Sequence, residues 1–143
     1  MQRTATAVWS GSLKEGKGAI STQSGVLNET PYSFVTRFEN GKGTNPEELI
    51  AAAHAGCFTM ALSAQLGTMN FMPQSLRTTA TLSLEKLEAG WTISKIHLDL
   101  AARIPGITKE AFDSAAASAK SNCPVSRLLK AEITLTASLE QAA

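Results

Sequence analysis

The sequence predicts an α+β fold with a mainly antiparallel sheet, on the basis of two observations. Short stretches of alternating apolar and polar residues, typical of strands, occur near both ends and in the middle of the chain, and two capped helical segments separate them. The 143 residues, 43% of them hydrophobic and 17% charged, fit one globular domain. Because no repeat, low-complexity tract or linker interrupts the sequence, we expect a single domain over residues 1–143.

The N-terminal part predicts short strands. Residues 4–9 and 18–22 flank a turn-rich stretch at residues 14–17, which is the pattern of a β-hairpin. A further strand is expected from Tyr32 to Phe38, and the glycine-containing stretch at residues 40–43 then breaks the chain.

The clearest element is a helix from Glu47 to about Leu66. Asn45 is a good N-cap, Pro46 suits the first helical position, and Glu47 and Glu48 lie near the positive end of the helix dipole. The segment LIAAAHAGCFTMALSAQL is apolar nearly all round, which predicts a helix buried on all sides. Polar residues interrupt it, so it is interpreted as a core helix and not a membrane span.

This helix also predicts a homodimer. A domain of this size covers one face of an apolar helix well, but hardly its whole circumference. A second copy of the chain is the economical cover and implies a large apolar interface. A monomer whose two helices cover each other is the alternative.

The second half of the chain predicts a hairpin, two helices and a last strand. The hairpin strands are residues 76–84 and 91–102, joined by a turn at residues 88–90. Thr108 caps a helix from Lys109 to about Ser121. After the Asn-Cys-Pro break, a short helix is expected over residues 125–130 and a strand over residues 133–139.

Composition excludes several classes of function. The net charge of +1, without a basic block, gives no electrostatic footprint for nucleic acid. The first 18 residues contain no apolar segment of the kind found in secretory signals, so a cytoplasmic protein is expected. In that reducing compartment the two cysteines are not expected to form a permanent disulfide.

Cys57 lies in the middle of the apolar helix. Burial there raises the pKa of a thiol and makes it inert unless a positive charge is near. His54 is one turn earlier and can reach, while an arginine would stay charged at any relevant pH. Arg37, on the predicted strand before the helix, is a candidate, although spacing alone favours a solvated strand arginine.

Cys123 directly precedes a proline at a predicted helix start, where backbone amides favour a thiolate. Each cysteine taken alone is also compatible with an inert core or junction residue. Together they are too far apart for a CxxC motif, but they suit a peroxidatic thiol with a resolving partner.

Two spaced motifs then carry a resemblance to a known family. The stretch GTNPEEL with AAAHAGCF and MAL, and the stretch NCPVS with LKA, closely resemble the signature of the OsmC/Ohr family. Residues 24–27 and TRF at 36–38 match as well, so the resemblance covers nearly the whole chain. The arginine in TRFENGKGTNPEE makes it similar to the OsmC branch (osmotically inducible protein C) and not the Ohr branch.

The resemblance implies an OsmC-like fold, an intertwined homodimer with its sheet packed on two central helices and two active sites at the interface. It also implies that Cys57 is the peroxidatic cysteine, Cys123 the resolving one, Arg37 the active-site arginine and Glu47 the carboxylate that holds it. Such proteins reduce organic hydroperoxides with an external dithiol, for which a lipoyl-type dithiol is one candidate, and need no metal or haem cofactor. Defence against oxidative or osmotic stress is the implied role.

Helix geometry bears on this assignment. At about 1.5 Å per residue, Glu47 lies on the order of 15 Å along the helix axis from Cys57. If Glu47 and Arg37 serve Cys57, they are expected to come from the partner chain across antiparallel helices. Glu48 projects to the opposite face from Cys57 and is better interpreted as a capping residue.

Other functions remain open at this point. A Cys–His hydrolase would use Cys57 with His54, but a mid-helix nucleophile lacks an obvious oxyanion hole. A zinc site from the two histidines and two cysteines lacks the usual paired spacing, and His97 is expected to face solvent. The serious alternative is a non-catalytic redox sensor or a protein that binds an apolar ligand in an interfacial pocket.

Overall fold

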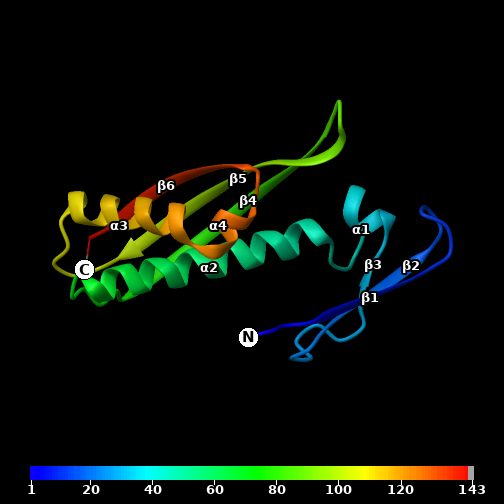
Figure 1. The fold of residues 1–143 in the computed structure, drawn as a ribbon, viewed down its shortest axis with the longest axis horizontal. Helices are drawn as coiled ribbons and strands as arrows, with labels where there is room; N and C mark the ends of the chain where they lie inside the picture. Colours follow the sequence, from blue (N-terminus) through cyan, green and yellow to red (C-terminus); the bar gives the residue numbers. More distant parts are fainter. Residues whose placement is uncertain (142–143) are drawn as a thin grey trace. The chain divides into compact units, whose positions relative to one another are not determined.

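The computed structural model describes residues 1–141 and divides the chain into two compact units, Met1–Leu49 and Ile50–Ala143. Each unit is described in its own frame. Helix α2, Pro46–Thr68, begins in the first unit and lies mainly in the second (Figure 1).

The N-terminal unit is a three-stranded antiparallel sheet followed by a short helix. Strands β1 (Ala5–Ser10), β2 (Lys17–Thr22) and β3 (Thr30–Tyr32) are hydrogen-bonded in that order. Strand β1 pairs with β2 along its full length, which confirms the predicted hairpin. Helix α1 spans Phe34–Phe38.

The predicted strand from Tyr32 to Phe38 is wrong, because the chain turns into α1 after β3. Ser33 caps this helix: its hydroxyl accepts a hydrogen bond from the Thr36 backbone N–H at 3.3 Å, and its own N–H donates to the Thr36 hydroxyl at 2.8 Å. This reciprocal capping box satisfies helix-terminal donors locally and outweighs the β-branched and aromatic composition of the segment. Arg37 therefore lies on a helix and not on a strand.

Helix α2 starts as predicted. The side chain of Asn45 accepts a hydrogen bond from the Glu48 backbone N–H at 2.8 Å, and Pro46 is the first helical residue. Within the single chain only one face of α2 is covered, as expected for a domain of this size, and its buried residues are His54, Phe58, Leu62 and Leu66. By length and composition alone, α2 is the one helix within residues 1–141 that could cross a membrane.

The second unit contains a mixed three-stranded sheet. Strands β4 (Ser75–Leu87) and β5 (Gly90–Arg103) form the predicted antiparallel hairpin, and β6 (Glu132–Glu140) pairs with β5 in parallel. The sheet therefore departs from a purely antiparallel one at its last strand. The parallel pairing requires a crossover, which α3 (Lys109–Asn122) and α4 (Pro124–Leu128) provide.

The core of this unit lies on one face of the sheet. Inward-facing residues of β5, at positions 96, 98, 100 and 102, are fully buried against α2 and α3. Figure 1 shows α3 running beside α2, so that two helices cover this face, as predicted. Thr108 caps α3 by accepting a hydrogen bond from the Ala111 N–H at 3.2 Å.

Candidate active site

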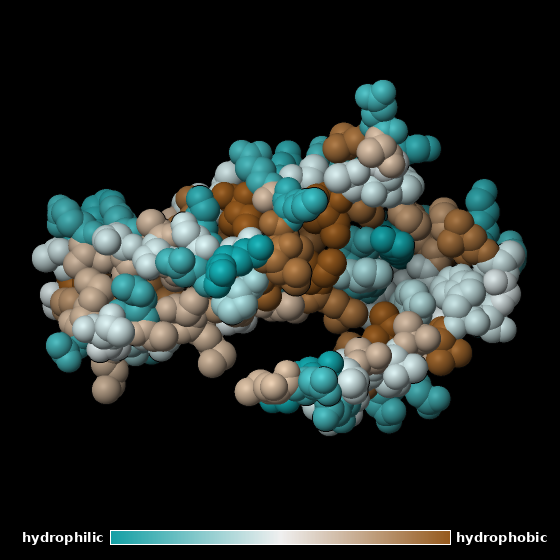
Figure 2. Space-filling view, in the orientation of Figure 1, coloured by the Kyte–Doolittle hydropathy of each residue, from teal (hydrophilic) through white to brown (hydrophobic). Residues whose placement is uncertain are grey.

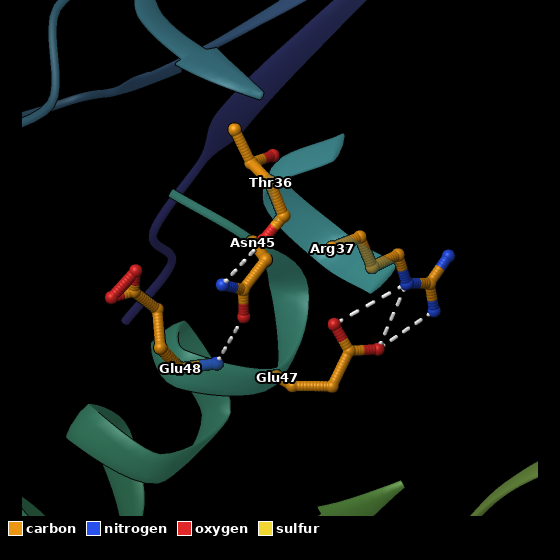
Figure 3. A network of polar contacts seen from close by, with 5 residues as sticks. All are labelled: Thr36, Arg37, Asn45, Glu47 and Glu48. Carbon is orange, nitrogen blue, oxygen red and sulfur yellow. Dashed lines mark hydrogen bonds and ion pairs between the residues drawn. The ribbon is translucent and has the colours of Figure 1, made fainter. Parts of the chain in front are cut away.

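Arg37 and Glu47 form an ion pair within the N-terminal unit (Figure 3). The Arg37 Nε lies 3.0 Å and 3.3 Å from the two carboxylate oxygens of Glu47, and Nη2 lies 2.8 Å from Oε1. The Glu47 side chain is 12% exposed and that of Arg37 is 40% exposed. The carboxylate therefore holds the guanidinium on two of its nitrogens and leaves the remaining donors available.

Local structure places these two side chains together. Asn45 ties the start of α2 to α1, because its side-chain nitrogen donates to the Thr36 carbonyl at 3.2 Å while its oxygen caps α2 (Figure 3). Arg37 is the residue after Thr36, and Glu47 is two residues after Asn45. The hydrogen bonds of Asn45 therefore hold α1 and the start of α2 close enough for Arg37 and Glu47 to pair. Glu48 points away from Arg37 in the same view.

An aromatic cleft lies beside Arg37 in the same unit. It measures about 280 Å³ and is lined by Trp9, Leu13, Tyr32, Ser33, Phe34, Arg37 and Phe38. The Arg37 guanidinium also lies 5.3 Å from the centre of the Phe38 ring, in cation–π range. The cleft thus combines apolar walls with one fixed cation at its edge.

The second unit brings the two cysteines together. Both are thiols, Cys57 half-buried on α2 and Cys123 fully buried at the junction of α3 and α4. Cys123 and the Val125 backbone lie close enough to Cys57 to influence the pKa of its thiol. Two cysteines that are remote in the sequence are therefore neighbours in the structure.

The surroundings of Cys57 favour its protonated form. Burial raises the pKa of the Cys57 thiol above its ordinary value, the Val125 backbone lowers it, and the neighbouring Cys123 raises it further. The groups that set the pKa of Cys57 include no cation. A nucleophilic Cys57 therefore needs a cation from elsewhere.

A buried polar chain continues from Cys123. The Cys123 sulfur lies 3.2 Å from the Ser126 hydroxyl and 3.3 Å from the Ser126 backbone nitrogen, which donates to it. The Ser126 hydroxyl in turn lies 2.7 Å from Nε2 of His54. Burial lowers the pKa of His54.

The structure groups the predicted site residues into two pairs, one in each unit: Arg37 with Glu47, and Cys57 with Cys123. His54 was expected to reach Cys57, but its Nε2 bonds Ser126 and its Nδ1 has no hydrogen-bond partner within residues 1–141. The base of the alternative hydrolase is therefore directed elsewhere.

His97 lies on the sheet face opposite the core. It is half-buried and not fully exposed, because its two ring nitrogens contact the hydroxyls of Thr134 and Thr136 at 2.6 Å and 3.1 Å. The part of the chain that the structure describes contains no group of three histidine, cysteine or acidic side chains placed to hold a metal ion.

Sequence reasoning missed Ser126 and the aromatic cleft. Ser126 occupies the third position of α4, where a side-chain hydroxyl lies near the cap residue Cys123. Its place in the Cys-Pro-Val-Ser helix start was the signal that could have revealed it.

Comparisons with known proteins bear on this arrangement. The profile of the OsmC-like protein family matches residues 39–138. Peroxiredoxin OsmC of Escherichia coli strain K12 is 58% identical over 129 residues, which cover 90% of this chain and 90% of that protein. The chain belongs to the OsmC family. The resemblance inferred from the sequence motifs is thus confirmed.

More distant OsmC-family relatives support the same grouping. An organic hydroperoxide resistance protein of Xanthomonas axonopodis is 28% identical over 100 residues, covering 69% of this chain and 68% of that protein. Among solved structures, the organic hydroperoxide resistance protein OhrB of Bacillus subtilis superposes with a TM-score of 0.67 at 25% identity, covering 96% of this chain and 98% of that one. The OsmC-like fold expected for the chain is therefore shown.

Proposed function

We propose that this OsmC-family chain reduces organic hydroperoxides to alcohols, with Cys57 as the peroxidatic and Cys123 as the resolving cysteine. Family membership and the names of the curated relatives, a peroxiredoxin and an organic hydroperoxide resistance protein, make the chain a thiol-based peroxidase. The observation that carries the cysteine mechanism is that Cys123 lies close enough to Cys57 to raise the pKa of its thiol.

The reaction proceeds in three balanced steps. The Cys57 thiolate attacks the outer peroxide oxygen, the O–O bond breaks, and the alkoxide leaves as the alcohol after taking a proton. Cys57 is left as a sulfenic acid, which condenses with the Cys123 thiol to a disulfide and releases water. An external dithiol then reduces this disulfide by thiol–disulfide exchange.

Arg37 supplies the cation that the first step needs. A guanidinium near Cys57 lowers the thiol pKa and can donate hydrogen bonds to the peroxide oxygens. Glu47 orients it through the bonds described above. The aromatic cleft beside Arg37 would hold the hydrocarbon part of the substrate, which favours organic hydroperoxides over hydrogen peroxide.

The active form is a homodimer in which Arg37 and Glu47 of one chain serve Cys57 of the other. Figure 2 shows apolar side chains gathered over α2 and α4. The exposed face of α2 carries mostly small residues around one large one: Ala52, Ala53, Gly56, Met60, Ser63 and Ala64. Small residues let a second helix approach closely, and Met60, which is 77% exposed, gains cover there. Glu47 and Cys57 are ten residues apart on one helix, about 15 Å, which favours service in trans.

Peroxide consumption tests the function directly. With cumene hydroperoxide and excess dithiol, the chain should turn over many times, while hydrogen peroxide and monothiols should support slower turnover. Cys57→Ser should abolish the activity. A redox sensor or a ligand-binding protein would be oxidised at most once per thiol pair, so the absence of turnover in the unmodified protein would reject the peroxidase.

Mixed dimers test the trans arrangement. A chain with Cys57→Ser is inactive alone and a chain with Arg37→Ala is slowed, but a dimer of the two has one site with both groups. Recovery of activity on mixing is expected. If mixing recovers none, Arg37 acts within its own chain.

A further inference from the structure

The polar chain from Cys123 to His54 lies outside the roles assigned so far. Its three members come from α2 and from the start of α4, and all are buried: Cys123 and His54 are 0% exposed and Ser126 is 8% exposed. Buried polar groups are costly unless they are hydrogen-bonded, so an unbroken buried line of a thiol, a hydroxyl and an imidazole needs an explanation. It ends on the sulfur that the proposed function assigns to resolution.

The directions of the bonds suit proton movement. The Cys123 S–H donates to the Ser126 oxygen at 3.2 Å, which leaves the single hydroxyl proton of Ser126 for another acceptor. His54 Nε2, at 2.7 Å, can be that acceptor. A proton that leaves Cys123 can therefore pass to Ser126 while the proton of Ser126 passes to His54, with no atom moving far.

We infer that Ser126 and His54 form a proton relay that deprotonates Cys123 as it attacks the Cys57 sulfenic acid. This inference rests on the proposed function and adds a general base to its second step. Neither residue touches the peroxide, so both act through Cys123 as positioning and proton-accepting groups.

The step balances as follows. The sulfur of Cys123 bonds to the sulfur of Cys57, and the S–O bond of the sulfenic acid breaks with its electron pair on oxygen. The thiol proton reaches His54 through Ser126, and the departing hydroxide recovers a proton through the same hydroxyl and leaves as water. No outside oxidant or reductant is required.

The environment of His54 fits a base at neutral pH. A pKa lowered by burial keeps the imidazole neutral, and so able to accept a proton, down to pH values below its ordinary 6.5. Ile96, Leu98 and Phe112 of the strands and α3 belong to the apolar core of the same unit. Burial is the one cause of the lowered His54 pKa, and the charged residue of α4, Arg127, is exposed.

The rate advantage has an upper limit. An ordinary cysteine with a pKa of about 8.5 is about 3% ionised at pH 7. A resolving thiol without a base must wait for that fraction, so a relay accelerates disulfide closure by up to about 30-fold at pH 7. The advantage disappears once the solution pH exceeds the thiol pKa.

A single-turnover experiment on the full-length protein tests the relay. Reduced protein is mixed with one equivalent of cumene hydroperoxide without reductant, and rapid alkylation and mass spectrometry follow first the sulfenic acid and then the disulfide. In the unmodified protein the closure rate should be level from about pH 6.5 to 8.5 and fall on acidification. In Ser126→Ala and His54→Gln it should rise with pH, be about 10- to 30-fold slower at pH 7, and approach the unmodified rate in alkaline solution.

His54→Gln separates the relay from a structural role, because glutamine keeps a hydrogen bond to Ser126 but accepts no proton at these pH values. Thr59→Val is the matched control: it removes an α2 hydroxyl, bonded to Thr78 at 2.8 Å, that has no place in the relay. It should keep the level profile.

Three results would overturn the inference. First, the rate of disulfide closure in the unmodified protein could rise tenfold per pH unit through pH 7, and this alone would overturn the inference. A level, unslowed profile in His54→Gln would show that the bond is structural. If the unmodified protein forms no sulfenic acid at all, the proposed function fails together with the relay. If the variants form sulfenic acid normally and close the disulfide at the unmodified rate, the relay alone is rejected.

Discussion

Replacing Arg37 by alanine should change the titration of Cys57, a residue of the other unit. Burial and Cys123 raise the pKa of Cys57 within its own unit. An arginine brought within about 4–6 Å lowers a neighbouring acid by about 1–3 pKa units. At the middle of that range, about 2 units, Arg37 increases the thiolate fraction at pH 7 about 100-fold. Since nucleophilicity falls with pKa at a Brønsted slope of about 0.4–0.5, the net gain in the rate of attack is about 10-fold.

The measurement is a titration of the thiolate ultraviolet absorbance in a Cys123→Ser background, paired with stopped-flow oxidation by cumene hydroperoxide. Arg37→Ala should raise the Cys57 pKa by about 1–3 units and slow oxidation at pH 7 by about 3- to 50-fold across that range, with the deficit shrinking as pH rises. Arg103→Ala is the matched control, because Arg103 also pairs with a glutamate and its side chain is 41% exposed, against 40% for Arg37. An identical Cys57 titration with and without Arg37 would refute its role.

Three further predictions concern stability and assembly. Phe58→Ala should lower the free energy of unfolding by about 3–5 kcal/mol in denaturant titrations, because the ring is fully buried. Met60→Ala, on the exposed face of α2, should lower the free energy of unfolding of the isolated chain far less. Asn45→Ala should cost about 1 kcal/mol, since it removes the cap from the Glu48 N–H, and equal thermal midpoints would contradict this. Gly56→Leu should leave the chain folded, because nothing lies within 4 Å of an added Cβ. It should block the close approach of a second α2, so light scattering should detect monomers. An intact dimer would place the interface elsewhere.

The elements predicted correctly from the sequence are those with local signals. The β1–β2 and β4–β5 hairpins follow from alternation around a turn, and α2 and α3 follow from Asn45 and Thr108 at their caps. Helix α1 was missed because two local signals compete there: aromatic and β-branched residues favour a strand, while Ser33 and Thr36 form a capping box. The parallel pairing of β6 with β5 was missed because strand direction depends on a long crossover and not on either strand.

The candidate site divides in the same way. Arg37 and Glu47 are ten residues apart, and their pairing depends on a short connection that Asn45 braces. The contact between His54 and Ser126 spans 72 residues, so no pattern within a window of the sequence could reveal it. The exposed face of α2 shows a related limit: an apolar helix indicates that burial is needed, but its composition does not specify which surface provides it.

The turn that starts α4, Cys-Pro-Val-Ser, suits the resolving role proposed for Cys123. Cys123 is the cap residue, Pro124 presets the helical backbone, the Val125 backbone binds the Cys57 thiol, and the Ser126 backbone and hydroxyl bind the Cys123 thiol. One turn thus holds both sulfurs from the same side. Disulfide formation must draw the sulfurs to about 2.05 Å and release these hydrogen bonds. Because Cys123 is both the C-cap of α3 and the N-cap of α4, this change falls at the junction of the two helices.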